Sequence, residues 1–248
     1  ITVGGVTSSV ISGGTTTISG LNLAISSTGT DVPVTVKYSG FQNSTTGGSL
    51  QAGVATVQVT LGYVEGTSGS GTVIINTTPI ASNAMTLVAS KPTVTVSSTM
   101  GGTLILGAEN KVGEFTVSAV AHGKISVATT TVNISVIGIS GTTTFGGFRV
   151  ADGNTTITGS NALMTSTSTS SGTVTVSFAP NYEISAGQPK TFSLFGTLSG
   201  TPAASITPYA ATSLTSAGFQ WRDVIGGNTQ YAGTNIINFP TNSYTTAR

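Results

Sequence analysis

The chain has no cysteine, one histidine, one tryptophan and few charged side chains. Without cysteine, a disulfide scaffold and a thiolate metal site are both excluded. Charged residues are 6% of the sequence, against about 25% in an average soluble domain, and the formal net charge is +1. Eight cations in 248 residues are too few for a basic stripe, so we expect no nucleic-acid partner. No apolar run approaches the roughly 18 residues of a spanning helix, so we expect no membrane insertion.

Threonine (47), glycine (33) and serine (32) make up 112 of the 248 residues and replace charged residues as the main polar and small component of the chain. Threonine is β-branched and suits a pleated strand, whereas glycine and serine weaken helices. Hydrophobic residues still make up 38% of the chain, which is enough to bury a core and argues against disorder. Hydroxyl groups do not titrate near neutral pH, and the chain begins at Ile1 rather than Met. We therefore expect an upstream segment to have been removed and the protein to be secreted or at the cell surface.

Period-2 alternation of apolar and polar residues recurs along the whole sequence. In residues 55–61 (ATVQVTL) every second side chain is apolar, which predicts a strand with one buried and one wet face. Turn signals recur about every 8–12 residues, a spacing typical of β-sandwiches, and Asp152-Gly153-Asn154 predicts a tight hairpin. No segment predicts a helix longer than a turn or two. The predicted fold class is all-β.

The predicted organisation is two immunoglobulin-like or jelly-roll-type β-sandwich domains with a strand-like N-terminal arm and a C-terminal extension. A boundary is expected near Ser90, because Lys91-Pro92 separates two alternating strands and the residue before a proline is held extended. The arm is apolar and is followed by Gly13-Gly14. The predicted divisions are 1–12 for the arm, 13–90 and 91–225 for the sandwiches, and 226–248 for the extension.

Several motifs in the second half of the chain resemble a recurring module of a known group of proteins. They are residues 113–119 (GEFTVSA) followed by 123–125 (GKI), 172–178 (GTVTVSF), 186–194 (AGQPKTFSL), 218–223 (GFQWRD), 238–241 (NFPT) and the terminal Arg248. On these motifs, residues 91–248 resemble uncharacterised secreted surface proteins of candidate-phyla-radiation (Patescibacteria-like) bacteria. The resemblance implies an immunoglobulin-like sandwich on a cell envelope or in an extracellular assembly, and it brings no catalytic residue with it.

Residues that could carry chemistry are few and isolated. A Ser-His-Asp triad or a histidine metal site would have to use His122, which falls in a predicted turn. Asp152 and Asn154 alone fall short of the six oxygen ligands that Ca²⁺ takes, so we expect no metal and no cofactor. A glycosidase is a minor alternative, because no aromatic-rich cleft signature surrounds any pair of carboxylates. We expect no enzyme. The carboxylates are Asp31, Glu65, Glu109, Glu114, Asp152, Glu183 and Asp223.

Aromatic residues and sequons provide the candidate surface features. Trp221, the only tryptophan, and its neighbour Phe219 are candidate core or interface aromatics, and stacking of Trp221 on a sugar is the alternative. Four Asn-x-Ser/Thr sequons are candidate glycosylation sites. They are Asn43, Asn76, Asn133 and Asn154.

Strands with few charges have little to prevent edge-to-edge pairing with another chain. The predicted function is therefore a structural subunit of an extracellular filament or pilus-like fibre, which pairs head to tail with copies of itself by donating a β-strand. The donor strand is predicted in the arm, and the tail from Gly226 is the other candidate. The alternatives are an S-layer protein and an adhesin module that binds cell-surface glycans. The predicted donor side chains are Ile1, Val3, Val6 and Val10.

Overall fold

The chain is built almost entirely of β-strands. The computed structural model describes residues 1–9, 14–37, 56–86, 88–97, 99–120, 123–157, 160–167, 170–224, 230–236, 238–240 and 244–247. Within these residues the only helical element is a single 3₁₀ turn, η1 (Gly233–Asn235). The predicted all-β class is confirmed. The chain divides into two compact units, Ile1–Gln42 and Asn43–Arg248.

The first unit contains a small three-stranded antiparallel sheet. Its central strand is β1 (Thr2–Val3), which pairs with β2 (Val6–Thr7) on one side and β3 (Val34–Thr35) on the other. The β1–β2 connection is a two-residue turn of Gly4 and Gly5 with φ of 52° and 86°. Both angles are positive, a conformation that glycine adopts without strain and that favours a tight hairpin. The N-terminal residues are thus folded back on themselves.

The second unit begins with a long two-stranded hairpin, which we call the ribbon (residues 56–86). Three antiparallel pairs are nested around one turn at residues 68–72, so all six short strands belong to a single hairpin. The pairs are β4 (Thr56–Val57) with β9 (Met85–Thr86), β5 (Thr60–Leu61) with β8 (Ile80–Ala81), and β6 (Val64–Thr67) with β7 (Val73–Asn76).

The region predicted as a first sandwich, residues 13–90, has a different organisation. Val57 is the only buried side chain among the residues described before Ser90, and Leu61, from the alternating stretch 55–61, is 46% exposed. The alternation correctly marks extended backbone. The described strands of this region therefore do not enclose a core.

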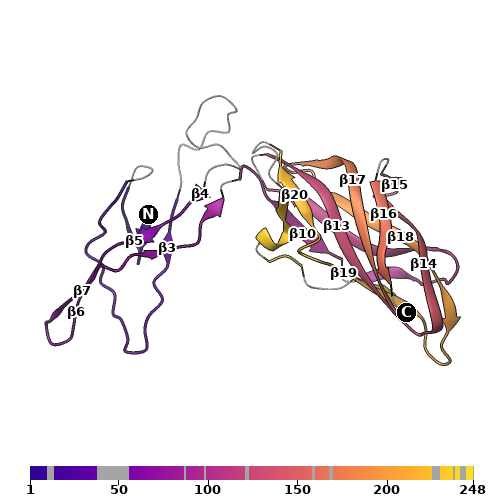
Figure 1. Ribbon diagram of the computed structural model, residues 1–248, viewed down its shortest axis with the longest axis horizontal. Helices are drawn as coiled ribbons and strands as arrows, with labels where there is room; N and C mark the ends of the chain where they lie inside the picture. Colours follow the sequence, from indigo (N-terminus) through magenta and orange to yellow (C-terminus); the bar gives the residue numbers. More distant parts are fainter. Residues whose placement is uncertain are drawn as a thin grey trace. The chain divides into compact units, whose positions relative to one another are not determined.

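A β-sandwich of two sheets follows (Figure 1). The long strands β13, β17 and β16 lie side by side in one sheet, and β12, β18 and β14 form the other. The five-stranded sheet has the order β10 (Pro92–Val96), β12 (Glu109–Ala119), β18 (Lys190–Pro202), β14 (Ile139–Asp152), β15 (Thr155–Thr156). The eight-stranded sheet has the order β11 (Thr99–Thr103), β22 (Tyr244–Ala247), β19 (Tyr209–Leu214), β13 (Lys124–Ile137), β17 (Ser171–Ser185), β16 (Ser160–Thr167), with β20 (Gln220–Asp223) beside β13 and β21 (Gln230–Ala232) beside β20.

The segment predicted as a C-terminal extension, 226–248, instead supplies strands to this sandwich. β21 pairs with β20, and β22 lies between β19 and β11. The pairing of β22 with β11 is parallel and joins residues far apart in the sequence, such as Thr99 and Thr245. Such a pairing depends on the finished sheet and leaves no local alternation signal, which is why the tail was not predicted to be part of the core.

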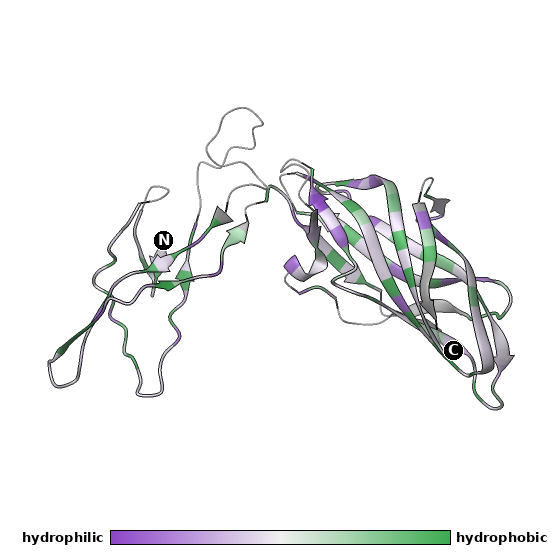
Figure 2. Cartoon of the chain, in the orientation of Figure 1, coloured by the Kyte–Doolittle hydropathy of each residue, from purple (hydrophilic) through white to green (hydrophobic). Residues whose placement is uncertain are grey.

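The core of the sandwich follows from the period-2 pattern. On β13, Val132, Ile134 and Val136 are each at most 4% exposed, whereas Asn133 and Ser135 between them are exposed. Figure 2 shows the same alternation of apolar and polar residues along the other long strands. Side chains from the two inner faces thus meet in one core, as in other packed sheets.

One buried hydroxyl in this core is not satisfied. Thr130 is fully buried on β13, and its Oγ1 has no hydrogen-bond partner among the described residues. A buried hydroxyl without a partner costs free energy that a methyl group of the same shape avoids.

We predict that Thr130→Val raises the free energy of unfolding by about 1 kcal/mol, measured by urea denaturation. Thr116→Val is the matched control, because Thr116 Oγ1 lies 2.8 Å from Thr191 Oγ1 and the substitution removes that hydrogen bond. The control is expected to leave stability unchanged or lower. A Thr130→Val protein less stable than the parent would contradict the prediction.

Candidate interaction surface

The two sides of the ribbon differ in side-chain character. Cross-strand partners lie on the same side, so the pairs Glu65–Ile75 and Thr67–Val73 share one face. The pairs Val64–Asn76 and Gly66–Ile74 share the other, which we call the opposite face; it bears small and polar residues beside these two aliphatic ones.

Tyr63 extends the first face. Tyr63 donates a hydrogen bond from its Oη to Glu65 Oε2 at 2.5 Å, which places both side chains on one side of the strand. We call this side the apolar face of the ribbon. Its large apolar residues, with their exposed fractions, are Tyr63 (51%), Val73 (53%) and Ile75 (54%), and Glu65 lies among them. Further along the ribbon, Leu61 (46% exposed) pairs with Ile80 (60% exposed).

The strand edges of the ribbon are also open. In the described part of the chain, each ribbon strand pairs only with its hairpin partner, so one edge of every strand offers unpaired backbone N–H and C=O groups. A two-stranded hairpin is marginally stable by itself in water and needs a third strand or a covering layer. Glu65 is the only charged residue and Pro79 the only proline in the ribbon, so it has few of the residues that usually protect natural edge strands. This combination makes the ribbon the strongest candidate interaction surface of the described residues.

The alternating pattern alone does not reveal the ribbon, because alternation predicts strands that are buried on one face. Val73, Ile74 and Ile75 form an uninterrupted apolar run, which is a signal that both faces of the hairpin carry apolar side chains. That run could have indicated that one sheet layer is insufficient to cover them.

The predicted donor strand at the N-terminus is already paired within its own chain. The Ile1 ammonium donates to Ser8 O at 2.9 Å, and Ser8 N donates back to Ile1 O at the same distance. Ile1, Val3 and Val6 are half-buried in this hairpin, and Val10 lies outside the described residues. Their role as donor side chains stays a prediction, and donation requires β1 to leave both β2 and β3.

The two candidate interface aromatics lie inside the sandwich. Phe219 is 0% exposed with its ring 5.7 Å from Phe239, and Trp221 is 2% exposed with its ring 4.9 Å from Tyr231. The indole N–H of Trp221 donates to Ala232 O at 3.3 Å. Both are core residues, so Trp221 offers no face to a sugar and neither belongs to an exposed interface. The i, i+2 spacing of Phe219, just before β20, and Trp221, on β20, was the signal that they share the inward face.

Three of the four sequon asparagines are exposed. Asn76 lies on the opposite face of the ribbon and accepts a hydrogen bond from Thr78 N at 2.9 Å. Asn133 lies in mid-strand on β13, and Asn154 lies in the turn between β14 and β15. Asn43 is outside the described residues. Glycosylation at these positions stays a prediction, and it is compatible with their exposure.

Carboxylates of the sandwich are engaged in ion pairs. Glu109 accepts two hydrogen bonds from Arg149, at 2.7 and 2.8 Å, and these bonds lower the pKa of the Glu109 carboxyl below its usual value. Glu114 pairs with Lys111, and Glu183 lies 3.4 Å from Lys124.

No described cluster of side chains offers a metal site. Within the described residues, no group of three or more metal-ligating side chains is gathered. His122, on which a triad would depend, lies outside them.

Asp152 is held by two groups at once. Its Oδ2 accepts hydrogen bonds from Lys190 Nζ and from Tyr182 Oη, both at 2.8 Å. Partial burial raises the pKa of the Asp152 carboxyl, but these two hydrogen bonds and the charge of Lys190 outweigh it, so the pKa lies below its usual value. The group ties β14, β17 and β18 together across the two sheets.

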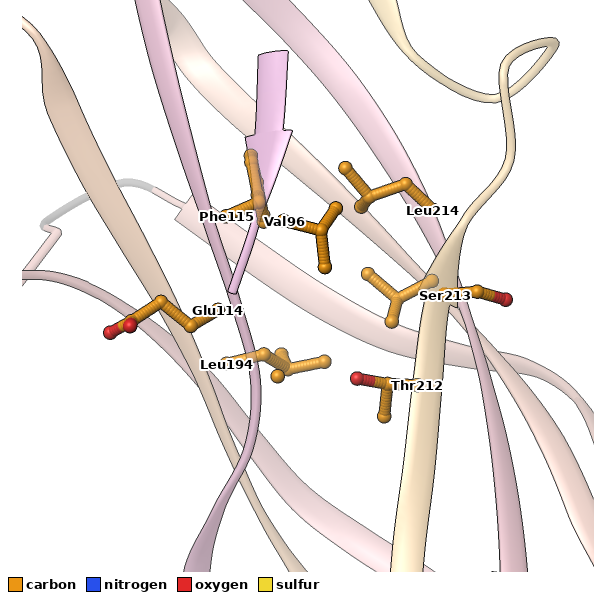
Figure 3. A pocket seen from close by; sticks show the side chains of 9 residues that line it. Val96, Glu114, Phe115, Leu194, Thr212, Ser213 and Leu214 are labelled. Carbon is orange, nitrogen blue, oxygen red and sulfur yellow. The ribbon is translucent and has the colours of Figure 1, made fainter. Parts of the chain in front are cut away.

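A small cleft opens between the sheets beside β10 and β19 (Figure 3). Its volume is about 10 Å³, enough for roughly one water molecule, and its lining includes Val96, Phe115, Leu194 and Leu214. Figure 3 shows the carboxylate of Glu114 pointing away from it. Ligand sites in proteins are usually hundreds of Å³ in volume, so this cleft is a packing gap at the edge of the core.

Comparison with known proteins gives only remote likenesses. No protein-family model and no curated protein matches the chain. A solved chain of the CaDoc0917–CaCohA2 complex is 15% identical, with a TM-score of 0.33 over 62% of this chain and 98% of that chain. The major pilin subunit of Bacillus cereus is 12% identical, with a TM-score of 0.24 over 69% of this chain and 46% of its own. These scores assign neither an activity nor a partner. None of the described residues forms a helix long and apolar enough to cross a membrane.

We predict that Asp152→Asn lowers the free energy of unfolding by about 1 kcal/mol at neutral pH, measured by urea denaturation. The folded-state pKa of Asp152 lies below its unfolded value of about 3.9, so its stabilisation is complete above that value and is lost as the pH falls through the folded pKa. The difference between variant and parent should therefore shrink in acid.

Glu183→Gln is the control for this measurement. Glu183 and Lys124 are each more than half exposed and 3.4 Å apart, so the change in the free energy of unfolding should stay within about 0.5 kcal/mol. An Asp152→Asn deficit that is equally large at every pH would show that the ion pair is not its cause.

Proposed function

We propose that the protein is a structural, non-enzymatic subunit of an extracellular homopolymer at the cell surface, assembled by β-strand pairing between copies. The observation that carries this proposal is the ribbon, with its exposed apolar face and open strand edges. Both features are normally covered in a folded protein, and an added strand would satisfy the backbone groups and bury the apolar side chains in one step.

Two properties of the chain support growth into a polymer rather than a closed dimer. The proposed donor strand and the ribbon are separate segments of the chain, so a contact in which one copy adds a strand to the ribbon of another joins different surfaces of the two copies. Such heterologous contacts form rings or open filaments, depending on the rotation between copies. The described part of the sandwich also has edge strands of its own, β15 and β16 among them.

The N-terminal arm, residues 1–12, remains our proposed donor strand. Its first eight residues form a short hairpin with few contacts, and β1 is only two residues long. Opening it costs few hydrogen bonds compared with the longer ladder that a ten-residue donated strand would form with another copy. The tail from Gly226 is the less favourable donor, because β21 and β22 would have to leave the sandwich.

Surface glycans fit this proposal through the placement of the sequons. Asn76 lies on the opposite face of the ribbon, so a glycan there would leave the apolar face free for a second copy. Hydroxyl-rich, weakly charged surfaces suit an extracellular location, where salt and pH vary.

We predict that the refolded protein forms uniform fibres in negative-stain electron microscopy and that Ile75→Asp prevents their formation at the same protein concentration. Ile75 lies on the apolar face directly opposite Glu65, so a second carboxylate there would repel Glu65 and would be costly to bury in the contact. Ile74→Asp is a closely matched control, because Ile74 is the adjacent residue, is similarly exposed and lies on the opposite face. It should still form fibres.

Other outcomes of this experiment separate the alternatives. Fibres from both variants would show that the ribbon is not the contact. Loss of fibres in both variants would contradict the assignment of the contact between copies to the apolar face. Flat lattices from the parent protein would favour an S-layer. Monomers alone under all conditions would overturn self-assembly, and glycan-array binding would then test the adhesin alternative.

We further predict that deletion of residues 1–12 leaves a folded sandwich that no longer forms fibres, and that a synthetic peptide of residues 1–12 blocks fibre growth of the parent protein. The peptide would occupy the acceptor edge and add a strand without adding a subunit. A scrambled peptide of the same composition is the control. Fibres formed by the deletion variant would rule out the arm as donor.

A further inference from the structure

The chain enters the sandwich through residues 88–92, which are fixed at several points. Val88 packs against the core, and Ser90 is 2% exposed with its Oγ donating to Val120 O at 2.9 Å. Val120 N donates to Lys91 O at 3.0 Å, which extends the pairing between β10 and β12 by one step. This segment is therefore attached to the sandwich before its first strand begins.

One contact in this segment comes from the other sheet. Ala89 N donates to Asp223 Oδ2 at 2.6 Å, across 134 positions of sequence. Asp223 is the last residue of β20, which pairs with β13 in the eight-stranded sheet, whereas β10 belongs to the five-stranded sheet. The carboxylate is thus a bridge between the two sheets at the point of entry.

Asp223 occupies a position where a carboxylate needs a specific reason. On β20 the buried side chains are Trp221 and Asp223, and Asp223 is 1% exposed. Carboxylates are rarely buried so completely unless they are paired or hydrogen-bonded, because removing the charge from water is costly. A hydrogen bond from a backbone N–H to an ionised carboxylate is about twice as strong as one between neutral groups.

The strand that follows this contact lies at the edge of its sheet. β10 is five residues long, stands at the end of the strand order of its sheet and pairs with β12, one residue to each cross-strand pair from Pro92–Ala119 to Val96–Phe115. As an edge strand at the N-terminal entry, it can separate from β12 one pair at a time, starting at Pro92. Separation would uncover the edge of β12 for pairing with another chain.

We infer that Asp223 is a lock on this edge: its bond to Ala89 N ties the entry segment to the opposite sheet and prevents β10 from peeling away from β12. The lock does not depend on the function proposed above. It requires only that opening of residues 88–96 begins with release of Ala89 from Asp223.

The test is amide hydrogen exchange of the full chain, compared between the parent and Asp223→Asn. The substitution keeps the shape of the side chain and removes its charge, so we expect exchange of residues 88–96 to become about tenfold faster. Exchange of the central strands β13 and β17 should not change. Ser90→Ala, which removes the bond to Val120 O, should accelerate the same residues by a smaller factor and gives a second reading if Asp223→Asn fails to fold.

Asp152→Asn is the matched control, since it makes the same chemical change in a carboxylate of other strands. It should leave exchange of residues 88–96 as in the parent. If Asp223→Asn speeds exchange in β13 and β17 by the same factor as in residues 88–96, Asp223 merely stabilises the whole sandwich and the lock is refuted. Unchanged exchange of residues 88–96 in Asp223→Asn, or equal acceleration in the control, would refute it as well.

Discussion

Packing among four aromatic rings is the interaction on which the sandwich depends. Phe115 and Phe192 come from one sheet, Phe178 and Tyr182 from the other, and Phe192 lies 5.2 to 5.3 Å, centroid to centroid, from each of the other three. Rings at these distances in tilted and edge-to-face arrangements add to the free energy of burial. In a chain where threonine, glycine and serine dominate, few other side chains are large enough to fill the space between two sheets.

The distribution of aromatic residues explains why only one part of the chain forms a sandwich in the described residues. Of the 16 Phe, Tyr and Trp residues, three precede Ser90: Tyr38, Phe41 and Tyr63. The first 90 residues therefore have strand-forming sequence without the bulk to build a second core. Backbone pairing still occurs, because β-branched residues favour it, but in the described residues of this part of the chain the product is the exposed ribbon and a small sheet. A strand needs β-branched residues, whereas a layered domain also needs side chains large enough to fill a core. The ribbon meets the first condition, and the sandwich meets both.

Alternation along the sequence was sufficient to predict the all-β class and the inward residues of individual strands such as β13. It was insufficient to predict which apolar faces would be covered, since cover comes from residues distant in the sequence. Leu61 and Ile134 occupy equivalent places in their local patterns, yet one is 46% exposed and the other 1%. The parallel pairing of the tail with β11 and the bond between Ala89 and Asp223 are likewise long-range. The spacing of Phe219, Trp221 and Asp223 indicates three inward positions. Only the fold shows that Asp223 accepts a hydrogen bond from Ala89 in the entry segment.

Charged side chains are concentrated in the sandwich and are nearly missing from the exposed ribbon. The sandwich carries the ion pairs of Asp152, Glu109 and Glu114, whereas the ribbon carries only Glu65. If the ribbon pairs with another copy, any force on that contact reaches the sandwich through residues 88–92 and acts first on the edge strand β10. An edge strand pulled from its end would separate one hydrogen-bonded pair at a time. The hydrogen bond from Ala89 N to Asp223 passes part of this force to the opposite sheet. The segment between the ribbon and the core is therefore attached to both sheets of the sandwich and not only to the edge of one.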